Sequence, residues 1–182
     1  VPLAELPPRA ARAVLLSEDA GFYAHSGFDF AEMRNALAEG AEAGHLKRGA
    51  STITQQLAKN LFLSRERTLA RKAREALATI ALEAALAKAR LLEIYLNVAE
   101  WGPDVYGIGE AAQHYFGKDA RALTPKEAAF LAAVIPSPIR LHAQLVRGAL
   151  PDWFRERVDG LLLRMASVGQ LTDEELREAL EQ

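Results

Sequence analysis

Two neighbouring carboxylates near the start of the sequence are the first candidates for chemistry. Glu18 and Asp19 follow the apolar run 13–16 and precede residues 21–27, which hold two aromatic residues, a histidine and two glycines. A carboxylate beside aliphatic and aromatic groups is partly desolvated, so its pKa rises and it becomes a usable base near neutral pH. Taken alone, the same residues favour a simpler interpretation, an ordinary helix end with a solvated acidic pair.

A second stretch, residues 48–60, is dense in hydroxyl and amide side chains and contains the cation Lys59. The spacing of Thr52 and Gln55 predicts a capping box, with a helix over 53–62. The free N–H groups of its first turn attract anions, and neighbouring hydroxyls could add hydrogen bonds. A plain helix cap is the alternative, and it explains Thr52 and Gln55 but not the whole stretch.

A third stretch combines cations with a carboxylate. Arg67, Arg71 and Arg74 recur at helical spacing and form a basic stripe, and Glu75 follows Arg71 by four residues. Guanidinium groups suit phosphate oxygens because they can donate two parallel hydrogen bonds. For an isolated helix, a solvated face with salt bridges is the simpler account.

The first two stretches together resemble the peptidoglycan glycosyltransferases, which polymerise the bacterial cell-wall glycan. That family carries the motif Glu-Asp-x-x-Phe-x-x-His-x-Gly-x-Asp, which residues 18–29 match. It also carries Gly-x-Ser-Thr-Ile-Thr-Gln-Gln-x-x-Lys-Asn, which residues 49–60 match. Both motifs are long and their order is fixed, so they are far more specific than a short glycine motif.

Further blocks extend the resemblance along the chain. Residues 71–75 resemble the family's third motif and residues 88–97 its fourth. The turn at 99–104 resembles that of the monofunctional biosynthetic members. The resemblance covers roughly residues 1–138 and weakens from Ile139 onward.

The resemblance implies polymerisation of lipid II, a disaccharide-peptide on undecaprenyl diphosphate, into β-1,4 glycan strands by an inverting displacement. Glu18 is the expected general base, because of its apolar flank. Glu75 is the second expected catalytic carboxylate, which could orient the cations or hold Mg²⁺ or Mn²⁺; no organic cofactor is expected. Arg74 stands where the family commonly has lysine. The residues expected to bind substrate are Asp19, Phe22, His25, Gly27, Gly49, Ser51, Thr52, Gln55, Gln56, Lys59, Asn60, Arg67, Arg71, Lys72 and Arg74.

The elements that must position these residues are helical. Apolar spacing and capping signals predict helices over the ranges listed next, and no segment of useful length alternates with the period of a strand. These ranges are 9–23, 30–43, 53–62, 68–98, 125–135, 153–168 and 172–181. The longest carries an apolar stripe of Leu69, Ala73, Leu77 and Ile80. The prediction is one all-α domain over 1–182, and the resemblance implies a lysozyme-like fold with a smaller mobile lobe near 30–65.

Composition limits the remaining possibilities. The chain has 182 residues, half of them hydrophobic, which suits one globular domain with a sizeable core. A formal net charge of −2 gives no basic field for nucleic acid, and the absence of cysteine excludes disulfides and thiolate metal sites. No apolar run reaches the about eighteen residues that span a bilayer.

The chain begins Val1-Pro2, and we interpret it as the soluble remainder of a protein whose N-terminal membrane anchor is absent from it. The resemblance places such a protein at the inner membrane, with its catalytic domain on the periplasmic face. The implied partners are lipid II, the growing glycan chain, the membrane surface and other cell-wall synthesis proteins. Two alternatives stay open, a lytic hydrolase of the lysozyme type using Glu18 as an acid and an inactive helical interaction module. The cations around Glu75 count against the first, because glycan hydrolysis has no diphosphate to stabilise.

Overall fold

The computed structural model describes residues 1–43, 51–63, 68–148 and 150–181, and most of them are helical, which confirms the all-α prediction. The chain divides into two compact units. The first combines residues 1–20 with 96–182, and the second covers 21–95. The single-domain assignment, the lysozyme-like arrangement and the mobility of residues 30–65 stay predictions. No helix within the described ranges has both the length and the apolar character needed to cross a membrane.

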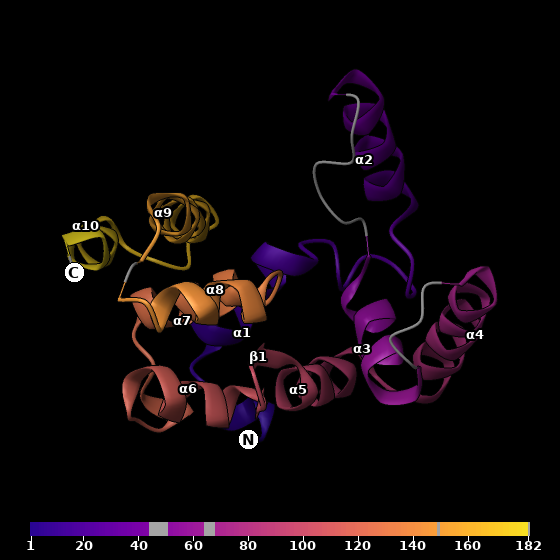
Figure 1. The fold of residues 1–182 in the computed structure, drawn as a ribbon, viewed down its shortest axis with the longest axis horizontal. Helices are drawn as coiled ribbons and strands as arrows, with labels where there is room; N and C mark the ends of the chain where they lie inside the picture. The colour runs from indigo at the N-terminus through magenta and orange to yellow at the C-terminus, as the bar shows by residue number, and fades with distance from the viewer. Residues whose placement is uncertain (44–50, 64–67, 149, 182) are drawn as a thin grey trace. The chain divides into compact units, whose positions relative to one another are not determined.

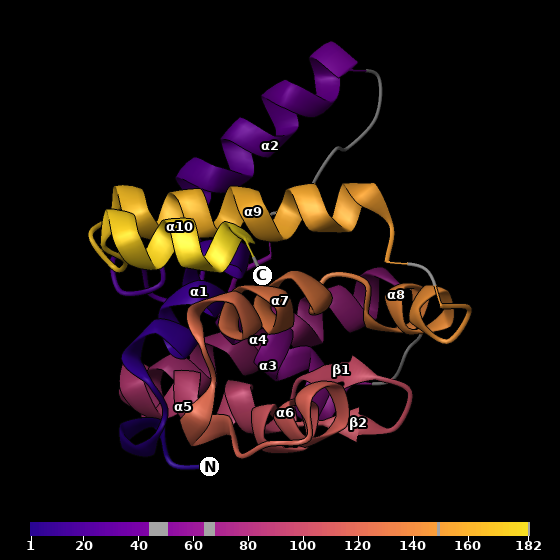
Figure 2. The ribbon, with the colours of Figure 1, turned by 90° about the vertical axis from the view of Figure 1, so that its left-hand side faces the viewer.

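The first unit is built around α7, which packs against α1, α6, α9 and α10. Figure 2 shows α9 and α10 side by side. Most side chains of α7 are buried, so this helix supplies core on several sides. The bounds of the unit's helices are α1 Pro8–Glu18, α6 Ile108–Phe116, α7 Pro125–Val134, α8 Pro138–Leu145, α9 Asp152–Ser167 and α10 Asp173–Glu181, with short 3₁₀ turns at Leu3–Glu5 and Ala120–Ala122.

A short hairpin lies where the sequence predicted only a turn. Strand β1 (Glu100–Gly102) pairs antiparallel with β2 (Val105–Tyr106), and Asp104 in the connection has a positive φ of 61°. The indole of Trp101 is buried and donates a hydrogen bond to the carbonyl oxygen of Leu131. Strands of this length are too short for their alternation to be recognised in a sequence, so the hairpin was missed.

The second unit contains α2 (Phe30–Ala43), α3 (Ile53–Phe62), α4 (Leu69–Ala85) and the first part of α5 (Lys88–Val98). Helices α3 and α4 pack side by side (Figure 1). Among the described residues, α2 makes no extensive contact with another helix or strand.

Two predicted helices are longer in the sequence interpretation than in the structure. The helix predicted over 68–98 is wrong, because Leu86 has an extended backbone that separates α4 from α5. This break contains neither glycine nor proline, so backbone propensity alone could not reveal it. The helix predicted over 9–23 ends at Glu18, because the backbone of Asp19 leaves the helical region, with φ −163° and ψ 74°.

The side of helix α4 that is buried is opposite to the side that its sequence pattern predicts. An apolar stripe normally marks the side of a helix that faces the core. Here Leu69 is 90% exposed and Leu77 68% exposed, while Glu75 and Thr79 on the other side are buried. The polar side of α4 therefore lies inside the protein.

Candidate active site

Glu18 is the last residue of α1, in the first unit, and it is half-buried. The neighbouring Ser17 hydroxyl lies 3.4 Å from Glu18 Oε1 and 3.2 Å from the carbonyl oxygen of Ala132 on α7. Asp19 is more buried than Glu18, at 8% exposure. Asp19 lies beyond the end of α1. Its expected role in substrate binding stays a prediction.

The second unit holds the turn at Gly27, whose φ is +87°. A side chain on Gly27 would place its Cβ 2.7 Å from Cγ2 of Thr79 and 3.0 Å from Cγ of Glu83, both on α4. The carbonyl oxygen of Gly27 accepts a hydrogen bond of 2.7 Å from the Thr52 hydroxyl. Only glycine combines this backbone angle with this close approach, so the glycine of the first motif has a geometric reason.

The predicted capping box at the start of α3 is confirmed. The backbone N–H of Gln55 donates to Thr52 Oγ1 at 3.2 Å, and the N–H of Thr52 donates to Gln55 Oε1 at 3.0 Å. Both side chains are buried, and in this arrangement they hold the helix start and the Gly27 turn together. Gln56 accepts a hydrogen bond from the Tyr95 hydroxyl. The side chains of Ser51, Lys59 and Asn60 are exposed to solvent.

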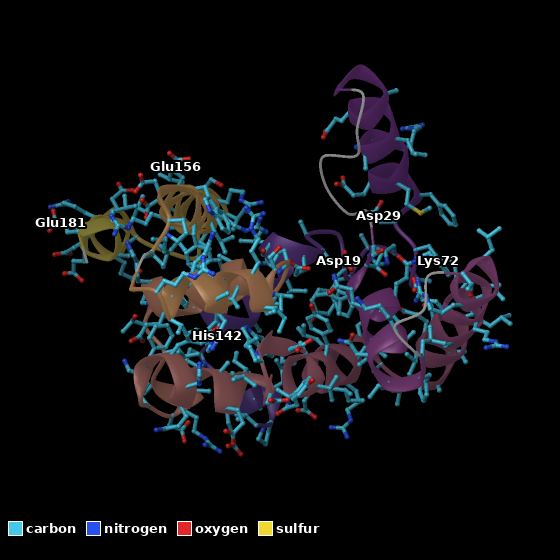
Figure 3. The ribbon with its side chains drawn as sticks, in the orientation of Figure 1. Asp19, Asp29, Lys72, His142, Glu156 and Glu181 are labelled. Atoms are coloured by element: carbon cyan, nitrogen blue, oxygen red, sulfur yellow. The ribbon has the colours of Figure 1, made fainter. Side chains whose placement is uncertain are left out.

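Glu75 is a buried carboxylate whose charge is balanced by cations. Its side chain is 4% exposed, its Oε2 accepts a 2.9 Å hydrogen bond from Arg71, and its Oε1 pairs with Lys72. Thr79 donates to its backbone carbonyl. Lys72 is labelled on α4 in Figure 3. Among the described residues no acceptor meets the buried Nε of Arg71, and Arg74 is exposed.

These contacts decide how well Glu75 fits a metal ion. Each of its carboxylate oxygens already bonds a cationic side chain, and a divalent cation placed there would be repelled by both. The arrangement around Glu75 therefore does not fit Mg²⁺ or Mn²⁺. The other expected role of Glu75, to orient Arg71 and Lys72, agrees with the geometry.

Residues of three predicted stretches meet within the second unit: the turn at Gly27, the start of α3 at Thr52, and α4. Glu18 and Asp19 belong to the first unit. Gly49 and Arg67 lie outside the described residues. Sequence reasoning missed Glu83, whose carboxylate contacts Thr54 and Lys88. Its signal was its place on α4, four residues after Thr79 and eight after Glu75, which puts all three on one side of the helix.

Comparison with known proteins agrees with the motifs. The family model described as Transglycosylase matches residues 1–166. A protein of Alcanivorax borkumensis named "Biosynthetic peptidoglycan transglycosylase" is 58% identical over 127 residues, which cover 70% of this chain and 52% of that protein. A protein of the same name from Nitrosospira multiformis is 44% identical over 167 residues, 92% of this chain and 71% of that protein.

Among solved structures, penicillin-binding protein 1A from Haemophilus influenzae is 27% identical, with a TM-score of 0.44, over 71% of this chain and 15% of that one. The chain spans between 52% and 71% of the length of the two relatives described above. The family model nevertheless covers most of it. The chain therefore belongs to the transglycosylase family.

Proposed function

We propose that this chain polymerises lipid II into β-1,4-linked glycan strands and releases undecaprenyl diphosphate. The observation that carries the proposal is the buried Glu75 with its two cations, Arg71 and Lys72, on a helix packed against α3. Such a cluster suits a leaving group whose negative charge grows during the reaction. The names of the relatives, which refer to peptidoglycan biosynthesis, support the same chemistry.

In the proposed reaction, Glu18 accepts the proton of the acceptor sugar's 4-hydroxyl while that oxygen attacks the anomeric carbon of the donor. The bond from the anomeric carbon to the diphosphate breaks, and its electron pair leaves with the diphosphate. One displacement converts the α-linkage into a β-1,4-linkage, so the protein needs no nucleophile. A positioned base of this kind contributes about 10²- to 10⁴-fold to a rate.

The diphosphate is stabilised by cations and N–H groups. Glu75 holds Arg71 and Lys72 in place before substrate arrives, which reduces the reorganisation needed in the transition state. The buried Nε of Arg71, which meets no acceptor among the described residues, is a further donor, since buried N–H groups usually have a partner. Lys59 and Arg74 are exposed cations able to meet phosphate oxygens.

A membrane surface at the periplasmic face is the proposed location, with other cell-wall synthesis proteins as further partners. The second unit exposes large hydrophobic side chains on several helices, and exposed apolar surface of this extent is typical of binding surfaces. Cations on the same helices, Arg34, Lys72 and Arg74 among them, suit anionic lipid headgroups. The exposed hydrophobic residues are Tyr23, Phe30, Leu37, Leu61, Phe62, Leu69, Leu77 and Ile80.

The test is incubation of the purified chain with labelled lipid II in detergent micelles, followed by gel separation of the products. We expect a ladder of glycan strands. A parallel incubation with preformed glycan distinguishes the hydrolase, because release of sugar without polymer formation would contradict the proposal. If neither product forms, lipid II polymerisation by this chain is also contradicted.

A further inference from the structure

Glu83 connects two segments through a single carboxylate oxygen. Its Oε1 accepts a 2.6 Å hydrogen bond from the Thr54 hydroxyl and a 2.7 Å bond from Lys88 Nζ. The Glu83 side chain is 11% exposed, and Thr54 is fully buried in the first turn of α3. A carboxylate this deeply buried depends on its cation and its hydrogen bonds, so its geometry is restrained.

The same side chain lies against the turn before α2. Cγ of Glu83 limits the space at Gly27, because a Cβ added to Gly27 would lie 3.0 Å from this atom. The ammonium of Lys88 also sits 4.3 Å from the centre of the Phe22 ring, within the range of a cation–π interaction. Two segments that carry proposed site residues, 22–27 and the start of α3, thus meet α4 at Glu83 and its partner Lys88.

We propose that Glu83 is a positioning residue for the transfer reaction. Its carboxylate fixes the first turn of α3 and the Gly27 turn relative to Glu75, which lies two turns, about 12 Å, away on the same helix. It touches neither substrate nor diphosphate, and it acts through Thr54 and Lys88. This inference rests on the proposed function, because the elements it positions carry Gly27, Thr52 and Gln55, which are expected to bind the substrate.

A positioning role has a kinetic signature. Charge on the diphosphate grows as the glycosidic bond breaks, so misplaced donors affect the transition state more than bound substrate. We expect Glu83→Gln to lower kcat by between about 10-fold and about 100-fold, with a much smaller change in KM. The glutamine keeps the shape of the side chain but removes the charge that Lys88 requires.

Variants of Thr54 separate positioning from loss of stability. Thr54→Val removes the hydroxyl, and Thr54→Ser keeps it. We expect Thr54→Val to lower kcat, Thr54→Ser to retain most of it, and the Glu83→Gln/Thr54→Val double variant to be no slower than the slower single variant, since both act on one contact. Glu127→Gln is the matched control, because Glu127 also pairs with a lysine, Lys118, but belongs to no proposed site.

All rates are measured below the onset of thermal unfolding of each variant, so that a smaller folded fraction cannot imitate a lower kcat. A folded Glu83→Gln variant with wild-type kcat would overturn the proposal. Rate losses that multiply in the double variant, or an equal loss in Glu127→Gln, would overturn it as well.

Amide hydrogen exchange tests the positioning without any activity. We expect Glu83→Gln to speed exchange at residues 25–28 and 52–56 while the remainder of α4 keeps its protection. Unchanged exchange in these two segments, or faster exchange throughout 21–95, would contradict positioning. If the wild-type chain makes no polymer, the proposed function fails, and the exchange pattern still decides whether Glu83 holds these segments.

Discussion

The hydroxyl of Thr52 donates a 2.7 Å hydrogen bond to the carbonyl oxygen of Gly27, and both residues are buried. The bond joins two motifs separated by 25 positions in the sequence. Because Thr52 also caps α3, the turn and the helix start cannot move independently without breaking it. The two motifs, which were recognised separately in the sequence, are thus joined by a direct contact.

Replacement of Gly27 tests this packing. We expect Gly27→Ala to lower the free energy of unfolding by about 2 to 4 kcal/mol, because alanine disfavours a positive φ and its Cβ would meet Thr79. Gly117→Ala is the matched control, since Gly117 has a φ of +66° but no atom of the described residues lies within 4 Å of the added Cβ. In that variant the free energy of unfolding should fall by only about 1 kcal/mol. Urea unfolding measures the stability of both variants. Equal losses of stability would contradict the close approach of Gly27 to Thr79.

Replacement of the proposed base tests the chemistry. Glu18→Gln removes the proton acceptor while keeping the size of the side chain. We expect no detectable polymer from lipid II, a fall of at least about 100-fold, together with an unchanged circular dichroism spectrum and unfolding temperature. Polymerisation at the wild-type rate would show that another group accepts the proton.

Arg74 offers a test of the proposed diphosphate contact, because it is exposed and its removal should leave folding intact. We expect Arg74→Gln to weaken binding of inorganic diphosphate about two- to fivefold, and the difference should shrink as salt is added. Titration calorimetry measures this affinity. Arg147→Gln, which removes an exposed arginine in the other unit, is the control, and an equal effect there would point to general charge attraction.

Acid stability should depend on Glu127. Burial raises the pKa of Glu127. Hydrogen bonds from Lys118 and Thr124 lower the pKa by more than burial raises it, so the pKa lies below its ordinary value of 4.5. A lowered pKa in the folded state means that this carboxylate stabilises the fold above pH 4.5 and that its contribution disappears as the pH falls through the folded pKa. Urea midpoints should therefore drop more steeply below pH 4.5 in the wild type than in Glu127→Gln. Parallel pH profiles would contradict this assignment.

Membrane binding should depend on the exposed side of α4. We expect Leu77→Gln to reduce binding to vesicles of phosphatidylglycerol and phosphatidylethanolamine about tenfold, because burying one leucine contributes about 1.5 kcal/mol or more. The control is Leu180→Gln on α10, where the leucine is 39% exposed. Vesicle co-sedimentation measures both variants, and equal binding would place the membrane contact elsewhere.

The sequence predicted those features of the fold that depend on local chemistry. Thr52 begins α3 with the capping box that its spacing to Gln55 indicated, and Thr124 begins α7 with a second capping box. Leu92 and Tyr95, two large side chains of the fourth motif, are buried. Gly27 and Glu75 were predicted as site residues because they belong to family motifs, which the sequence shows through residue types and their order.

Features that depend on contacts between distant segments were not predictable in this way. The interruption at Leu86 follows no breaker residue, and Lys88 just beyond it reaches back to Glu83. The sequence shows an apolar stripe on α4 but not which side of the helix faces inward. That choice depends on the buried partners of its polar side, Thr54 and Gly27 among them.

The reversed orientation of α4 has a practical consequence for engineering. A redesign for higher expression yield would replace Leu69 and Leu77 first, because exposed hydrophobic residues are the usual targets of such a redesign. Under the proposed membrane role of α4, such a variant should concentrate well and yet turn over a lipid-linked substrate poorly. We therefore expect screening by yield alone to favour variants that have lost the proposed membrane contact.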